Sequence, residues 1–122
     1  MFMRGALLAA LCLASPLLKA ETATADPPAG EKLFSATCVA CHGAVAEGNP
    51  AFGAPALAGQ SAAYLQRQLG HFRGGQRGAQ AGDSGGAQMA PMAKVLADDA
   101  AVQDVAAYLA GLPVPVVASS LQ

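Results

Sequence analysis

The chain has 122 residues, of which 53% are hydrophobic, and a formal net charge of −1. This length is enough for one domain with a modest core. Because the chain has no stripe of basic residues, nucleic acid is not an expected partner.

Residues 1–20 have the pattern of a cleavable export signal. Arg4 precedes an apolar run over residues 6–18, which is shorter than the roughly 20 apolar residues that a membrane span needs. We expect cleavage after Ala20, with Ala23 and Ala25 as later alternatives. The mature protein is then periplasmic and has no stable membrane insertion.

Two other interpretations of this segment fit the residues less well. Pro16 within the apolar run and Lys19 after it argue against an uncleaved membrane anchor. A lipid anchor on Cys12 is opposed by the preceding Leu11, which is a poor match to such a site. The chain accordingly divides into a signal peptide (1–20), an N-terminal extension (21–28), one domain (29–112) and a C-terminal tail (113–122).

Removal of the signal changes the charge of the chain. Five basic and eight acidic residues remain after residue 20, which gives a net charge of −3. This charge suits a soluble protein that meets its protein partners briefly. The sequence carries no strong sign of an oligomer, so we expect a monomer.

Three helices are predicted in the mature chain. Asp26 caps the first helix, which leads toward residue 37, and Pro27 suits its first position. Ser61 caps a second helix that runs to about residue 73. The last helix begins near Asp98 or Asp99, and apolar residues at 102, 105, 106 and 109 share one face. Gly111 is expected to cap its C-terminal end.

The segments between these helices are predicted to be loops. Residues 43–53 contain helix breakers, residues 55–60 are irregular, and residues 74–88 are rich in Gly, Gln and Ala. We expect the last of these to be a mobile surface loop. Because no alternation typical of strands occurs, the predicted fold class is all-α.

The most informative motif is Cys-x-x-Cys-His, formed by Cys38, Cys41 and His42, the attachment pattern of a c-type haem. Two thiols three residues apart lie on one side of a helical turn. There they can add to the two vinyl groups of one porphyrin, and the adjacent imidazole can bind the iron. We therefore expect one covalently attached haem, with its iron, that moves one electron at a time.

Two other uses of the motif are less well supported. A structural zinc site needs four ligands, but the only other histidine is His71 and there is no second pair of cysteines. A thiol-exchange pair belongs to a βαβ context, and no run of β-branched residues lies near Cys38. Haem attachment remains the prediction.

The second axial ligand of the iron is expected to be a methionine. Met89 and Met92 are the only methionines outside the predicted signal, and a methionine ligand raises the reduction potential. Methionines more often fill hydrophobic cores, which is the expected role of the other member of this pair. His71 is a competing ligand, although a partly exposed structural histidine is the simpler interpretation.

With these features the chain resembles class I c-type cytochromes, and most closely the single-haem modules that also occur doubled in periplasmic dihaem cytochromes. The resemblance covers residues 29–112. The matching positions are Gly30, Phe34, 38–43, 55–60, 64–65, 68–69, 72–75, 89–92 and 106–109.

The resemblance implies roles for several residues. The carbonyl of Pro55 should accept a hydrogen bond from the iron-binding His42. Gly30, Phe34 and Tyr108 should lie where the first and last helices cross. In the matching modules the first methionine of the pair is the ligand, which favours Met89 over the alternative Met92.

Two further implications concern the start of the last helix and the haem propionates. Ala97 stands where these modules commonly have a capping serine, which should weaken the start of the last helix. Arg73, Arg77 and Tyr64 either hydrogen-bond the haem propionates or form part of the solvated surface.

The implied function is that of a periplasmic one-electron carrier with His/Met ligation that docks transiently with redox proteins and is not an enzyme. One alternative is a cytochrome subunit of a larger dehydrogenase or oxidase complex. Another is a haem enzyme or gas sensor with a displaceable sixth ligand.

Overall fold

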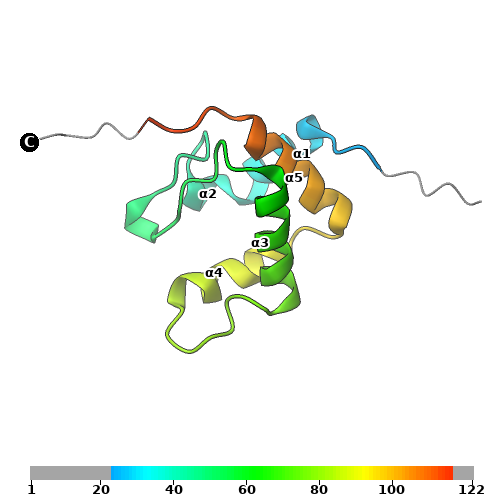
Figure 1. Ribbon diagram of the computed structural model, residues 1–122. Coiled ribbons are helices and arrows are strands. Elements are labelled where there is room, and N and C mark those ends of the chain that lie inside the picture. Colours follow the sequence, from blue (N-terminus) through cyan, green and yellow to red (C-terminus); the bar gives the residue numbers. More distant parts are fainter. Residues whose placement is uncertain (1–22, 117–122) are drawn as a thin grey trace, which may run out of the picture.

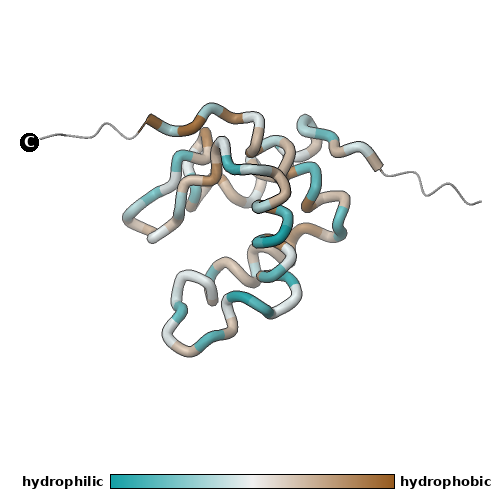
Figure 2. Tube along the Cα trace, in the orientation of Figure 1, coloured by the Kyte–Doolittle hydropathy of each residue, from teal (hydrophilic) through white to brown (hydrophobic). Residues whose placement is uncertain are grey.

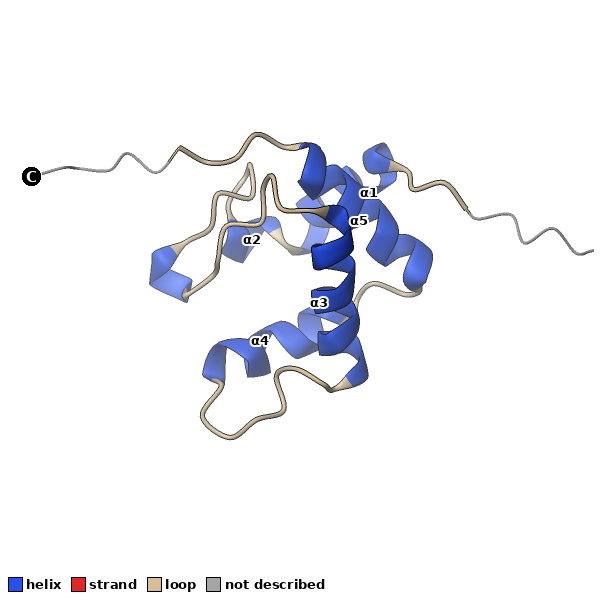
Figure 3. Cartoon of the chain, in the orientation of Figure 1, coloured by secondary structure: helices blue, strands red, loops and turns tan. Residues whose placement is uncertain are grey.

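The computed structural model describes residues 23–116, which contain helices and no β-strand (Figure 1). Figure 3 shows two long connections between helices, residues 43–61 and residues 75–83. The all-α prediction is therefore confirmed. The elements, in chain order, are α1 (Pro27–Thr37), α2 (Val39–His42), the 3-10 helix η1 (Pro50–Phe52), α3 (Ala62–Gly74), α4 (Ser84–Ala93) and α5 (Asp99–Gly111).

The predicted export signal, residues 1–20, lies outside the described residues, as do residues 117–122 of the predicted tail. Among the described helices, none combines the length and hydrophobicity required to cross a membrane. The described stretch after α5 alternates apolar residues with prolines (brown and pale teal in Figure 2), and Val114 and Val116 in it are exposed.

The predicted helix starts are confirmed by side-chain caps. The carboxylate of Asp26 accepts a hydrogen bond from the N–H of Ala29, and the hydroxyl of Ser61 accepts one from the N–H of Tyr64. The start of α5 is not weakened by Ala97, because the carboxylate of Asp98 accepts from the N–H of Ala101 at 2.8 Å. A neighbouring residue thus replaces the expected serine cap.

Two predicted boundaries were wrong. Residues 84–88 belong to α4, because the Asp83 carboxylate accepts from the N–H of Gly86 at 2.8 Å and caps the helix. Pro91 lacks an N–H for the helical ladder, and α4 ends two residues later. At the other end of the chain, Gly111 is the last residue of α5 and Leu112 is the C-cap.

The core forms where α1 and α3 pack against α5. The Phe34 and Tyr108 rings lie 5.8 Å apart between centroids, and Phe34, Val105 and Leu109 are the largest fully buried side chains. A Cβ on Gly30 would overlap the Asp104 carbonyl oxygen, so only glycine permits this approach of α1 to α5. The crossing implied by the resemblance is present.

We predict that Gly30→Ala lowers the free energy of unfolding by about 1–3 kcal/mol, because the new methyl group forces the two helix backbones apart. Gly70→Ala is the matched control: a Cβ there, on α3, meets no atom within 4 Å. That change should leave stability unchanged or raise it by about 0.5–1 kcal/mol. Denaturant unfolding followed by circular dichroism measures both, and equal stabilities of the two variants would contradict the prediction.

Candidate functional site

The Cys-x-x-Cys-His motif occupies the junction of two helices. Cys38 is both the C-cap of α1 and the N-cap of α2. Its carbonyl accepts hydrogen bonds from the N–H groups of Cys41, at 3.2 Å, and His42, at 3.0 Å. This single turn holds the two thiols and the imidazole close together. Cys38 is half-buried, Cys41 is exposed, and His42 is buried, with 7% of its surface accessible.

The His42 ring has a fixed orientation. Its Nδ1 atom lies 2.9 Å from the carbonyl oxygen of Pro55, as the resemblance implied. A carbonyl oxygen can only accept, so Nδ1 is the donor of this hydrogen bond, and in a neutral imidazole Nε2 then has the free electron pair. That nitrogen can bind a metal, and the hydrogen bond fixes the tautomer and angle of the ring.

The loop after α2 places Pro55. Gly48 has a φ of +85°, and a Cβ there would lie 2.6–2.9 Å from backbone atoms of residues 54–56. The carbonyl of the buried Ala46 accepts from the N–H groups of Leu57 and Ala58. Ala46 itself has a φ of +58°. Sequence reasoning missed Ala46, because alanine gives no signal of a left-handed backbone conformation.

Burial raises the pKa of the Cys38 thiol to about 11, and the nearby Cys41 adds to the shift. Thiol exchange requires a thiolate and favours a lowered pKa, so the thiol-exchange interpretation loses support. A thioether carries no charge at any pH, and it therefore suits this partly buried position. The pKa shift is compatible with thioether formation at Cys38.

Within residues 23–116, no group of three or more His, Cys, Asp or Glu side chains is placed to hold a metal ion. His71, the competing axial ligand, is exposed on α3. Met89 and Met92 lie on α4, three residues apart and therefore on neighbouring positions of one helix face. Met89 is half-buried, whereas Met92 is 41% exposed. The structure thus brings Cys38, Cys41, His42 and Pro55 together, and places the methionines on a separate element.

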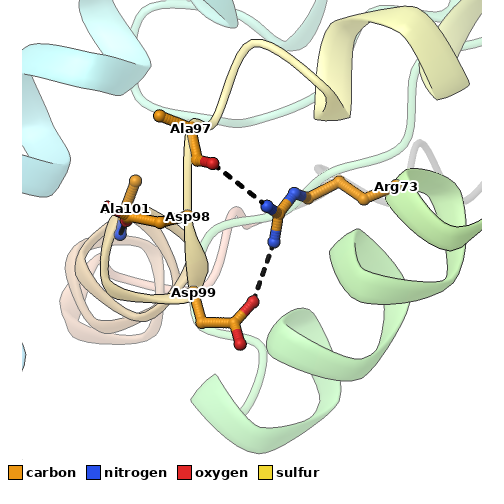
Figure 4. Close-up of polar contacts among 5 residues, drawn as sticks. All are labelled: Arg73, Ala97, Asp98, Asp99 and Ala101. Atoms are coloured by element: carbon orange, nitrogen blue, oxygen red, sulfur yellow. Dashed lines mark hydrogen bonds and ion pairs between the residues drawn. The ribbon is translucent and has the colours of Figure 1, made fainter.

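The side chains considered for the haem propionates have partners within the protein. Arg73 forms an ion pair with Asp99 at 2.9 Å and a hydrogen bond of 3.4 Å to the Ala97 carbonyl (Figure 4). Arg77 lies over the ring of Phe72. Tyr64 is 41% exposed, with the Arg67 guanidinium 6.0 Å from its ring centroid. Arg73 therefore joins α3 to the start of α5.

We predict that Arg73→Gln lowers the free energy of unfolding by about 0.2–1 kcal/mol, a small effect because the Asp99 side chain is 92% exposed. Asp99→Asn should cost a similar amount, and the double variant should lose less than the sum of the two. Denaturant unfolding at low salt and at 1 M salt measures this cycle. If the coupling energy between Arg73 and Asp99 did not weaken at 1 M salt, the electrostatic explanation would be contradicted.

Comparisons with known proteins agree with this site. The profile of the family named Cytochrome c matches residues 28–113. Cytochrome c-554(548) of Halomonas halodenitrificans is 44% identical over 84 residues, which cover 68% of this chain and 92% of that protein. A thiosulfate dehydrogenase electron acceptor of Stutzerimonas stutzeri is 35% identical over 111 residues, 84% of this chain and 46% of that protein.

A third relative, cytochrome c4 of Thiocapsa roseopersicina, is 43% identical over 91 residues, which cover 72% of this chain and 41% of that protein. This chain thus spans nearly all of the first relative but less than half of the other two.

The donor set of the motif fits a c-type haem. Cys38 and Cys41 present two thiols from one turn, and the hydrogen bond between Nδ1 of the buried His42 and the Pro55 carbonyl leaves Nε2 as the nitrogen that can bind iron. The matched profile spans both this motif and α4, over more than half of the chain. The chain therefore belongs to the cytochrome c family, and it transfers electrons by means of a covalently bound haem and its iron.

Proposed function

We propose that this cytochrome is a periplasmic one-electron carrier in which His42 and Met89 bind the iron. The strongest support is the hydrogen bond from Nδ1 of the buried His42 to the Pro55 carbonyl, 2.9 Å long. It leaves Nε2 available as a ligand. It also holds the imidazole ring in one orientation, so the ring moves little when the iron changes charge. The bound haem supplies the chemistry, the gain and loss of one electron at its iron.

Each residue of the site has a distinct role in this proposal. Cys38 and Cys41 hold the haem through thioethers, and the carbonyl of Pro55 fixes the orientation of the His42 ring through the hydrogen bond to Nδ1. Met89 approaches from α4 as an uncharged, soft ligand that favours ferrous over ferric iron. Its partial burial and its place as the first methionine of the pair support Met89 over Met92.

We propose that redox partners dock near the attached edge of the haem, with the carrier acting as a monomer. Cys41 is exposed there, and Val45 and Phe52 on the following loop are 60% and 58% exposed. A small apolar contact of this kind suits short-lived encounters. The name of the Stutzerimonas stutzeri relative, an electron acceptor, supports a redox enzyme as one partner.

The test is an absorption spectrum of the haem-loaded protein, oxidised and reduced. A six-coordinate haem should give a thioether–iron band in the ferric state, and the reduced protein should bind carbon monoxide slowly or not at all. Rapid binding of carbon monoxide by the untreated reduced protein would instead indicate a haem enzyme or gas sensor with a displaceable sixth ligand.

A second candidate is a cytochrome that serves one particular dehydrogenase, as a subunit or as its dedicated acceptor. The similarity to a thiosulfate dehydrogenase electron acceptor over 84% of this chain favours it. Stable co-purification with a larger redox enzyme would support the subunit form, whereas recovery of the cytochrome alone would support the free carrier.

A further inference from the structure

Helix α4, which carries Met89, has limited attachment to the rest of the protein. It packs mainly against α3, and its only buried residues are Gly86 and Ala93. Both ends of α4 continue into loops, residues 75–83 before it and residues 94–98 after it (Figure 1). Because few residues of α4 are buried, its position also depends on how the loops at its two ends are held. Arg73 bonds to Ala97 in the following loop, and Arg77 lies in the preceding one.

Arg77 anchors the preceding loop to α3 through three contacts. Its Nη1 donates to Oε1 of Gln68 at 2.7 Å, and its guanidinium carbon lies 4.6 Å from the ring centroid of the buried Phe72. Its backbone N–H donates to the His71 carbonyl at 3.1 Å. A guanidinium can stack on a ring and donate in its plane at the same time. Arg77 is thus held in one place by both side chain and backbone.

The next residue, Gly78, packs directly against α4 and so connects the anchored loop to that helix. A Cβ on Gly78 would overlap the carbonyl oxygen of Gly86 and lie 3.0 Å from the Cβ of Ala90. Gly78 also has a φ of +84°, which glycine adopts readily. The loop backbone therefore lies directly against one turn of α4, at the residue that follows Met89.

We propose that Arg77 and Gly78 form a brace that fixes α4 on α3, and that they are positioning residues for Met89. This inference rests on the proposed role of Met89 as an axial ligand. A thioether is a weak, neutral ligand, so its bond to iron depends on a helix that already holds it in place. Loosening the brace lets external ligands compete for the iron.

The test compares Gly78→Ala with Gly82→Ala in the haem-loaded protein. Gly82 lies in the same loop with a φ of +86°, but a Cβ there meets no atom within 4 Å. Both changes strain the backbone, and only the first pushes on α4. Gly78→Ala should raise the affinity of ferric haem for imidazole about tenfold, within the usual range of coupling between sites. Gly82→Ala should change that affinity less than about twofold.

A second pair of variants tests the anchor. Arg77→Gln should also weaken the thioether–iron band and raise the affinity for imidazole, and Arg77→Lys should restore only part of the loss. Arg67→Gln is the control, since Arg67 lies beside the exposed Tyr64 ring on the same helix. It should leave both measurements unchanged.

Hydrogen exchange of the α4 amides distinguishes failure of the brace from failure of the proposed ligand. Gly78→Ala should speed exchange over residues 87–93 about tenfold relative to Gly82→Ala, because local opening becomes easier. Equal exchange and equal imidazole affinity in the two variants would overturn the brace. A wild-type protein without a thioether–iron band would instead overturn the role of Met89, and the exchange rates would still decide whether the brace holds α4.

Discussion

Replacing both Cys38 and Cys41 with alanine should produce a protein that retains no haem after denaturing electrophoresis. The two thiols are the only cysteines among the described residues, so no other thiol there can form a thioether. The measurement is haem staining of the gel together with the absorption spectrum of the purified protein. We also expect loss of most helical circular dichroism, because the core of this short chain is small and its largest buried side chains are Phe34, Leu65, Phe72, Leu96 and Leu109.

The single variants are the controls for this prediction. Cys38→Ala and Cys41→Ala each leave one thiol on the turn, so each should retain some covalent haem through a single thioether. Their reduced haem spectrum in denaturant should shift, because one vinyl group stays unsaturated. Haem that remained covalently bound in the double variant would contradict attachment through this motif.

The sequence was most informative where a short stretch of chain determines its own geometry. Asp26 and Ser61 cap helices through contacts three residues away, and the haem motif lies within one helical turn. These features depend on neighbours in sequence, so the pattern of residue types predicts them. The hydrogen bond between His42 and Pro55 spans 13 residues and was expected only through the resemblance to a family.

The features that were missed depend on tertiary contacts. Gly85, Gly86 and Pro91 all disfavour a helix, and α4 forms nevertheless because Asp83 caps it and α3 packs along it. The ion pair between Arg73 and Asp99 joins residues 26 apart, and no local pattern marks it. Packing thus overrides propensity in the helix that carries the proposed ligand.

Removing the proposed methionine ligand should change the absorption spectrum and the reduction potential of the haem. Met89→Ala should abolish the thioether–iron band of the ferric protein and open the reduced iron to carbon monoxide. The reduction potential should fall by on the order of 0.1 V, a fraction of the roughly 0.8 V that axial ligands span. The physical reason is that a neutral thioether stabilises the ferrous state. Water or an external ligand in its place stabilises the ferrous state less.

Met92→Ala is the matched control, since Met92 lies three residues away on the same helix and is 41% exposed. It should keep the band and the potential, and lose only the stability that a partly exposed methionine provides, about 1 kcal/mol or less. If the band persisted in Met89→Ala and vanished in Met92→Ala, the ligand would be Met92. The register of α4 would then differ from the one that the matching cytochrome modules imply.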